Sequence, residues 1–326
     1  MVAPPLLVTF KRYARAHLHE SPTIGDLARA IGTSERTLQR VMADALGTDR
    51  RWVPLSPLRS IVTFFAVGRR SGRPRGQREA TLKYTVELFS DRAWPDEQMN
   101  ALFAEGFPAF ITADAEVKKY IARVRTNFPH LYVMLVDEVG VPGATGWGVP
   151  ISWSGDVDDL PTSFADVLRR SVELVDAGAD ANTFVICGGV VHPGLKGTGT
   201  ATELIQTLIR TGQCHGMTRV IAPLRPTRKH LYPLFSIADY ASWVREDGLA
   251  FDPWVRLHVR AGARVIALAP AAQTMTGTVA DWQGWVGMPL PATGQYVIPD
   301  GMSVLSIDAT ANMGTYVEPN IWVQHK

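Results

Sequence analysis

The sequence predicts an α/β protein: a central mixed β-sheet flanked by helices, with a small all-α module before it and a β-rich extension after it. Three observations predict this class. The first 80 residues are basic with helical apolar spacing, strand and helix patterns alternate from residue 81, and a glycine-rich turn joins a strand to a helix near residues 190–204. At 326 residues and 46% hydrophobic, the chain is long enough for about two domains.

Composition and cysteine usage exclude several classes of protein. No run of about 18 apolar residues is present to span a bilayer, and Lys11 and Arg12 interrupt the apolar N-terminus too early for a secretory signal. Cys187 and Cys214 are the only cysteines, and their spacing fits neither a disulfide framework nor a zinc site. We therefore expect a cytoplasmic protein that neither enters a membrane nor holds a metal.

The net charge of +2 hides an asymmetry between the two ends of the chain. Residues 1–80 carry 14 Lys or Arg against 6 Asp or Glu, whereas the remainder carries 19 against 25. A basic segment attached to an acidic body is typical of an appended nucleic-acid-binding module. The charge pattern therefore makes DNA a candidate partner of residues 1–80.

Two short helices are predicted within this basic segment. Thr23 and Asp26 form a variant of the capping box, Gly32 ends the first helix, and Ser34 can cap a second helix. The string DLARAIGTSERTLQRVMADALGT resembles one of the paired helix-turn-helix units of AraC-type transcription regulators. The resemblance implies that four side chains face the DNA groove: Arg36, Thr37, Gln39 and Arg40.

The segment departs from AraC-type regulators in having one such unit instead of two. A single unit binds DNA weakly unless the protein dimerises, so a homodimer is part of this hypothesis. The alternative is a three-helix packing module with no DNA-binding role. We place this module at residues 1–66 and a basic linker at 67–80.

From residue 81 the pattern alternates between strands and helices. The expected strands are 81–89, 130–139, 144–153, 182–191 and 218–224, and the expected helices are 95–107, 113–126, 163–178 and 199–216. The succession of strand, glycine-rich turn, helix and strand over 182–224 is a crossover unit. It requires two neighbouring strands that are parallel or splayed.

The turn at the centre of this unit is small and polar. Residues 196–201 read K-G-T-G-T-A and bring several backbone N–H groups to a helix N-terminus, where the helix dipole also favours an anion. The spacing fits neither a P-loop nor a dinucleotide-binding fingerprint. The turn is therefore a candidate phosphate site, and the alternative is a turn that holds no ligand.

A strand, then V-x-P, a basic residue and x-x-G-x-A opening a helix is similar to the acyl-CoA diphosphate motif of the GNAT acyltransferases. Here the motif falls on Val191, Pro193, Lys196, Gly199 and Ala201, within a matching order of elements over residues 81–278. The resemblance implies acetyl-CoA as co-substrate, with a longer acyl chain left open. The residues then expected to bind it are Val190, Val191, Lys196, Gly197, Thr198, Gly199, Thr200, Ala201 and Lys229.

The same resemblance directs attention to a later helix. In GNAT enzymes a hydroxyl residue stands four places before a glycine that ends this helix, and here His258 stands four places before Gly262. The resemblance thus implies that His258 protonates the leaving thiolate, because its pKa lies near neutral pH. A structural or substrate-positioning histidine is the alternative. A general base is not evident in the sequence.

An unusual insert precedes that helix. Arg225, Arg228 and Lys229 in this insert could reach either the phosphates of CoA or an acidic substrate, while its aromatic residues are expected to pack. Residues 279–326 form the predicted extension, with a short helix followed by short strands. Glu318 and Asn320 would contribute to the acceptor cleft if the extension walls it, and otherwise belong to its packing.

The function expected from these residues is transfer of an acyl group from CoA to a small primary amine. A backbone N–H near Cys187–Gly189 would polarise the thioester carbonyl, and the amine would attack it directly. Cys187 lies in an apolar strand and is predicted to be an inert thiol. The alternative function is a DNA-binding regulator whose acyltransferase-like domain senses acyl-CoA.

Overall fold

The computed structural model describes residues 28–30, 32–34, 37, 84–95, 98–99, 102 and 106–326. The chain divides into two compact units, Met1–Thr81 and Leu82–Lys326. In the first unit the backbone N–H of Thr37 donates to Ser34 Oγ at 3.2 Å, the bond that a cap at Ser34 requires. Arg36, Gln39 and Arg40 lie outside the described residues, so the helix-turn-helix and its DNA contacts stay predictions.

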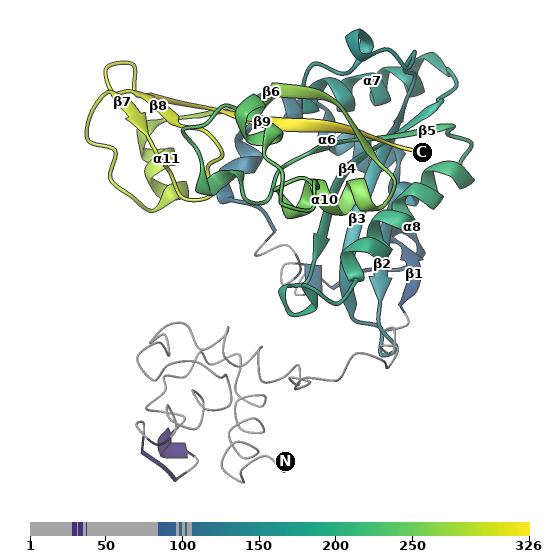
Figure 1. Ribbon diagram of the computed structural model, residues 1–326, viewed down its shortest axis with the longest axis horizontal. Coiled ribbons are helices and arrows are strands. Elements are labelled where there is room, and N and C mark those ends of the chain that lie inside the picture. The colour runs from purple at the N-terminus through teal and green to yellow at the C-terminus, as the bar shows by residue number, and fades with distance from the viewer. Residues whose placement is uncertain are drawn as a thin grey trace. The chain divides into compact units, whose positions relative to one another are not determined.

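The second unit is built on one mixed sheet (Figure 1). The strands run in the order β1-β2-β3-β4-β5-β9-β8-β7, and β6 pairs with β9. β4 and β5 are parallel and the other pairs are antiparallel. The predicted α/β class with a mixed central sheet is confirmed. The strands are β1 (Thr85–Leu88), β2 (Tyr132–Val136), β3 (Pro142–Ile151), β4 (Thr183–Val191), β5 (Arg219–Leu224), β6 (Arg264–Gly277), β7 (Gly294–Tyr296), β8 (Leu305–Asp308) and β9 (Met313–His325).

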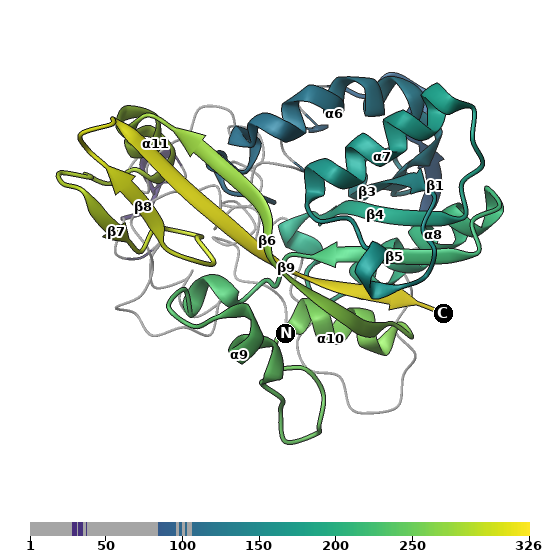
Figure 2. The same ribbon diagram turned by 90° about the horizontal axis from the view of Figure 1, so that it is seen from above.

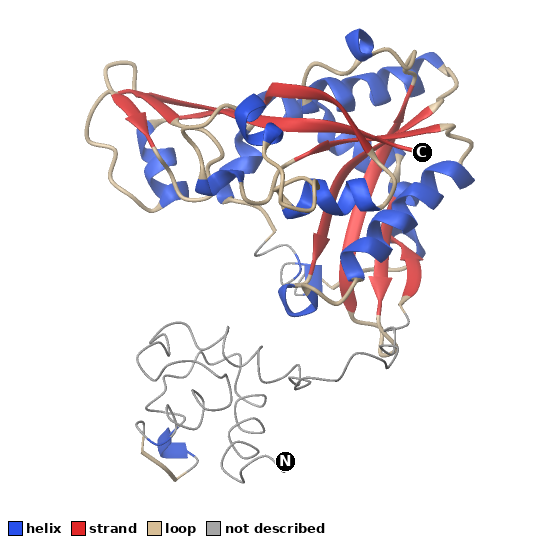
Figure 3. Ribbon diagram, viewed as in Figure 1, coloured by secondary structure: helices blue, strands red, loops and turns tan. Residues whose placement is uncertain are grey.

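Helices cover both faces of this sheet (Figures 2 and 3). Asp114, Ser163 and Asp252 cap the helices that follow them by accepting hydrogen bonds from first-turn backbone N–H groups. The helices are α6 (Ala115–Asn127), α7 (Phe164–Ala177), α8 (Thr200–Cys214), α9 (Ile237–Ser242), α10 (Pro253–Arg260) and α11 (Val279–Val286), and the short 3₁₀ turns are η2 (Phe89–Asp91), η3 (Ala109–Ala113), η4 (Pro129–Leu131), η5 (Val157–Asp159), η6 (Pro193–Leu195) and η7 (Lys229–Leu231).

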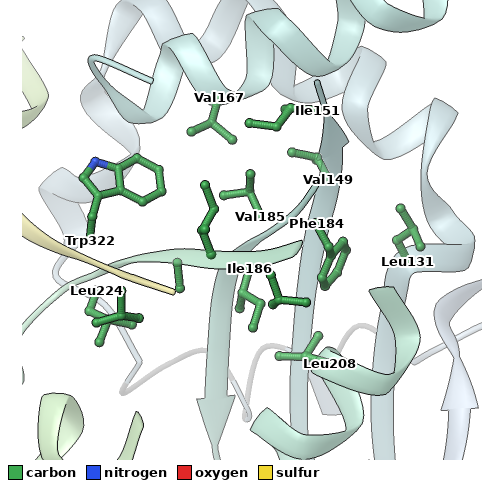
Figure 4. Close-up of a cluster of buried hydrophobic side chains, with 14 of the residues drawn as sticks. Leu131, Val149, Ile151, Val167, Phe184, Val185, Ile186, Leu208, Leu224 and Trp322 are labelled. Atoms are coloured by element: carbon green, nitrogen blue, oxygen red, sulfur yellow. The ribbon is translucent and has the colours of Figure 1, made fainter. Parts of the chain in front are cut away.

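The hydrophobic core lies on both sides of the central strands. Figure 4 shows Val167 of α7 above them and Leu208 of α8 below them. Trp322 of β9 points toward the side of Val167, while Leu224 of β5 points to the side of Leu208. Because β9 carries the buried Trp322, residues from the end of the sequence complete the core of the central sheet.

β9 differs most from the sequence prediction. Short strands were expected over 295–325, yet β9 runs for 13 residues and pairs with β6 along its length. On its other side it pairs with β8 up to Tyr316 and with β5 from Ile321. We call Val317–Asn320 the junction, because neither β5 nor β8 is paired to it. Pro319 within this strand lies opposite an irregularity in β6, where its missing N–H breaks no ladder bond.

Residues 279–326 contribute to two parts of the structure. α11, β7 and β8 build a lobe with its own core around Phe110, Trp282 and Tyr316, whereas β9 joins that lobe to the central sheet. The two ends of β9 belong to different cores. The division into residues 81–278 and 279–326 stays a prediction. β9 contributes both to the central sheet and to the lobe.

Candidate functional site

The glycine-rich turn after β4 has the backbone shape that its sequence predicts. Gly197 and Gly199 have φ values of +80° and +92°, which glycine adopts more readily than other residues. Gly199 is the residue immediately before α8. Lys196, Gly197, Thr198 and Gly199 are exposed, and Thr200 is buried. The turn thus brings its backbone to the surface at the N-terminus of a 15-residue helix.

Several N–H groups of this turn are free to bind a ligand. No side chain among the described residues caps α8. Among the described residues, none accepts a hydrogen bond from the N–H groups of Gly197, Gly199, Thr200 or Ala201. Because the helix dipole adds a partial positive charge at the same point, these groups suit a phosphate or diphosphate. The backbone at residues 197–201 therefore fits the CoA diphosphate.

Three hydroxyl groups lie at the base of this turn. Thr200 Oγ1 is 2.8 Å from Thr198 Oγ1 and 3.1 Å from the phenol oxygen of Tyr84. Tyr84 immediately precedes β1 and is 116 residues away in sequence from Thr200. No local pattern could have connected Tyr84 with the turn, because only the pairing of β1 through β4 brings them together. These hydroxyls hold the turn in place from beneath.

A gap between β4 and β5 opens beside the turn. The two strands pair only over Thr183–Val185 and Arg219–Ile221, although β4 continues to Val191 and β5 to Leu224. The pairing of β3 with β4 shifts between Trp147 and Gly148, which leaves Cys187 without a register partner. In the described part of the chain, no strand is therefore paired with β4 beyond Val185 on its β5 side. A bound thioester requires an opening of this kind.

The residues along this part of β4 have small or buried side chains. Gly188 lies so close to the indole of Trp147 that an added Cβ would come within 2.9 Å of its Nε1. Val190 packs against Met134 and Val136 in a buried cluster, and Val191 pairs with Ala144. Of the predicted CoA-binding residues, Val190 and Val191 are thus placed to offer backbone groups. Their side chains belong mainly to the core.

Cys187 has the properties of an unreactive thiol. Its Sγ donates a long hydrogen bond of 3.5 Å to the carbonyl oxygen of Val185. Burial raises the pKa of the thiol, and a hydrogen bond from the backbone of Val149 opposes this rise only in part. The thiol therefore stays protonated, in agreement with direct attack by the acceptor.

His258 is not open to the gap in this structure. Its side chain is 1% exposed, and its Nδ1 lies 3.0 Å from Nε2 of His325. Among the described residues, none bonds to its Nε2. Burial lowers the pKa of His258 to about 3 and that of His325 to about 4. A sealed, neutral imidazole is a poor proton donor, so the geometry favours a structural pair over the predicted acid.

This pair predicts a loss of stability at mildly acidic pH. An unfolded histidine takes up a proton near pH 6.5, whereas the folded pair does so only near pH 4 and pH 3. The stabilisation is therefore complete above pH 6.5 and is lost progressively as the pH falls toward 4. We expect the free energy of unfolding, measured with urea, to fall by roughly 2–4 kcal/mol between pH 7 and pH 5.

Two variants separate this effect from other titrations and from catalysis. A double variant, His258→Gln with His325→Gln, should flatten the pH dependence, and His215→Gln, at an exposed position, should leave it unchanged. A steep dependence that survives in the double variant would show that other groups cause it. If folded His258→Gln loses turnover at pH 7 by a hundredfold or more, His258 acts as the predicted acid.

Lys229 is placed differently from the prediction. Its side chain is 1% exposed, and Nζ donates to the carbonyl oxygens of Met302 at 2.6 Å and Tyr232 at 2.8 Å. Burial lowers the pKa of this amine. The lysine joins the insert to the C-terminal lobe. Its amine is buried, so a CoA phosphate approaching from the solvent would not reach it. The geometry therefore disfavours the predicted contact with CoA.

Two other features of the described residues bear on the class of protein. They contain no group of three or more His, Cys, Asp or Glu side chains arranged to hold a metal ion. Within the same part of the chain, no helix combines the length and apolar character needed to cross a membrane.

Comparison with known proteins supports an N-acetyltransferase enzyme. The chain is 25% identical over 281 residues to the arginine N-acetyltransferase avaD of Aspergillus versicolor, and the match covers 77% of this chain and 94% of that protein. No family model matches the chain. With the mixed sheet, the gap between β4 and β5 and the exposed turn before α8, this similarity supports a GNAT-like fold.

Similar solved structures have lower identity. The loading GNATL domain of CurA from Lyngbya majuscula matches 75% of this chain and 98% of its own, at 15% identity and a TM-score of 0.45. The GphF GNAT-like decarboxylase in complex with isobutyryl-CoA matches 74% and 98%, at 16% identity and a TM-score of 0.42. An agmatine N-acetyltransferase variant matches 74% and 98%, at 15% identity and a TM-score of 0.36.

Proposed function

We propose that this protein is an acyl-CoA-dependent N-acetyltransferase that acetylates a small primary amine. The observation that supports this most strongly is the set of free N–H groups at residues 197–201 beside the gap between β4 and β5. The similarity to an arginine N-acetyltransferase adds the class of acceptor. We infer acetyl-CoA as the donor and a small cationic amine such as arginine as the acceptor.

The chemistry follows from the placement of these groups. The N–H groups of Gly197, Gly199, Thr200 and Ala201 would hold the diphosphate, so that the pantetheine arm enters the gap. A backbone N–H near Cys187–Gly189 would donate to the thioester carbonyl and stabilise the negative charge on its oxygen. The neutral amine attacks the carbonyl carbon, the C–S bond breaks, the amine loses a proton and the thiolate gains one. No covalent intermediate with the enzyme is needed.

Ligand-dependent stability and turnover test this proposal. At an acetyl-CoA concentration about 100 times its Kd, binding adds about 2.7 kcal/mol to the folded state. For a unit of this size we expect the Tm to rise by roughly 5–10 °C. Release of free thiol with arginine as acceptor would then show turnover. A protein that gains no stability from acetyl-CoA or CoA would contradict the donor site, and turnover limited to water would contradict the acceptor class.

DNA binding through residues 1–80, sensing of acyl-CoA by a regulator, and a homodimer stay predictions.

A further inference from the structure

Arg225 is held at the open end of the gap with one nitrogen free. It is the first residue after β5. Its Nε donates to Glu318 Oε1 at 2.6 Å, and its Nη2 donates to the carbonyl oxygen of Asp300 at 2.8 Å. Among the described residues, none accepts a hydrogen bond from Nη1. The side chain is 20% exposed, so this nitrogen can reach a ligand.

Glu318 fixes the position of Arg225 from within the protein. Its side chain is 0% exposed, and its Oε2 also accepts a hydrogen bond from the phenol of Tyr316 at 3.0 Å. The Tyr316 oxygen in turn accepts from the N–H of Met302 at 2.7 Å. Glu318 Oε2 also accepts a longer hydrogen bond of 3.4 Å from Arg225 Nη2. A buried carboxylate with these three contacts orients the guanidinium strongly. Arg225 is therefore a preorganised donor.

Asn320 supplies an acceptor without a partner at the same place. The residue is 5% exposed, and its Nδ2 donates weakly to the carbonyl oxygen of Pro223 at 3.4 Å. Its Oδ1 is buried, and no described residue donates to it. Buried polar atoms nearly always have a partner, and one that lacks a partner costs free energy unless a ligand or water supplies one.

The strand register places Arg225 and Asn320 next to each other. Pro223 pairs with Trp322 and Leu224 with Ile321, so the next positions along, Arg225 and Asn320, face each other. Because side chains alternate along a strand, Asn320 lies on the same face as Trp322, which Figure 4 shows on the side of α7. Asn320 also belongs to the junction, where β9 has no strand on its β5 side. Among the described residues, a free donor and a free acceptor thus lie beside each other where β5 ends.

We propose that Arg225 and Asn320 bind an α-amino acid as the acceptor. Arg225 Nη1 donates to the α-carboxylate, and Asn320 Oδ1 accepts an N–H of the α-amine. The inference rests on the proposed acetyltransferase activity and names its substrate class. The carboxylate and the amine of an α-amino acid are attached to the same carbon. Their spacing therefore suits a donor and an acceptor at facing strand positions, as Arg225 and Asn320 are. An amine held through its N–H keeps its lone pair for attack on the thioester.

Pairs of amines that differ only in the carboxylate test this assignment. We would measure kcat/KM for L-arginine against agmatine and for L-lysine against cadaverine, with acetyl-CoA saturating. The wild type should prefer each amino acid by at least roughly tenfold, as expected for one charge-assisted hydrogen bond. Arg225→Met should lower kcat/KM for the amino acids by roughly ten- to a hundredfold and leave the decarboxylated amines within about threefold.

Substitution of Asn320 should affect the amino acid and its decarboxylated amine alike, because both compounds carry the amine that Asn320 is proposed to bind. Asn320→Leu should lower kcat/KM for arginine and agmatine by similar factors. The matched control is Arg245→Met, an exposed arginine of the same insert, which should change neither value. Because Arg225→Met leaves Glu318 buried without its partner, the double variant with Glu318→Met provides an uncharged version of the pair. The Tm and the acetyl-CoA-induced shift of each variant report its folding and donor site.

Each outcome decides the proposal. Equal kcat/KM for arginine and agmatine in the wild type overturns it, as does an amino acid preference that persists in both Arg225 variants. If Arg225→Met folds but loses the acetyl-CoA shift, the arginine binds the donor and the acceptor assignment is wrong. If acetyl-CoA binds but no turnover occurs, calorimetry measures whether arginine binds to the CoA complex. Absence of arginine binding would then overturn the acceptor inference and leave the donor site in place. If acetyl-CoA itself does not bind, the proposed function fails first.

Discussion

Ala201→Glu is expected to abolish the stabilisation of the protein by acetyl-CoA and CoA. Ala201 is the second residue of α8, and its N–H is one of the free groups of the turn. A carboxylate here would face the diphosphate. Two like charges about 4 Å apart repel by about 4 kcal/mol at an effective dielectric constant near 20. We therefore expect CoA affinity to fall by roughly a hundred- to a thousandfold in calorimetry and the thermal shift to disappear.

The controls separate loss of binding from loss of folding. Ala201→Ser adds a small uncharged group and should keep the thermal shift. The Tm of Ala201→Glu without ligand should stay within a few degrees of the wild type, because a carboxylate in the first turn of a helix is electrostatically favourable. If Ala201→Glu binds CoA as tightly as the wild type, the diphosphate lies elsewhere and the proposed donor site is wrong.

Trp322→Ala is expected to have the largest effect on stability. The indole is buried in the main core, on a strand that pairs with both β5 and β6. Replacing a buried tryptophan by alanine costs about 3–5 kcal/mol through lost burial and the cavity left behind. For a unit of this size the Tm should fall by roughly 6–20 °C, measured by calorimetry or circular dichroism.

Val317→Ala on the same strand is the matched control. Val317 is exposed and lies at the start of the junction, so its loss should cost less than about 1 kcal/mol. Similar effects of the two substitutions would indicate that β9 does not close the core. A strong effect of Trp322→Ala alone would show that the end of the sequence belongs to the central sheet.

The glycine-rich turn and several elements around it could be predicted from sequence because their signals are local. Gly197 and Gly199 specify the turn, Asp252 and Pro253 specify the start of α10, and the apolar run at 183–191 specifies a buried strand. Each depends on residues that are neighbours in the chain.

The rest of the site could not be predicted, because its geometry depends on distant pairings. His258 and Lys229 were chosen by their position in a motif and by their charge, and the structure buries both against partners more than 60 residues away. Arg225 and Glu318 are 93 residues apart and meet only once β9 pairs with β5. Tyr84 joins the glycine turn across 116 residues. Sequence patterns describe a residue's neighbourhood along the chain and do not describe these contacts.

The long-range pairing of β9 also has a consequence for how the protein folds. β1 to β4 can assemble from residues close together in the chain, whereas the edge of β5 that faces away from β4 must wait for β9, about a hundred residues later. Closing so long a loop is slow. Until β9 pairs with β5, that unpaired edge of β5 and the apolar residues that pack against Trp322 are exposed to other chains. Aggregation during refolding should therefore compete with this late step, and slower, cooler refolding at low protein concentration should improve the yield.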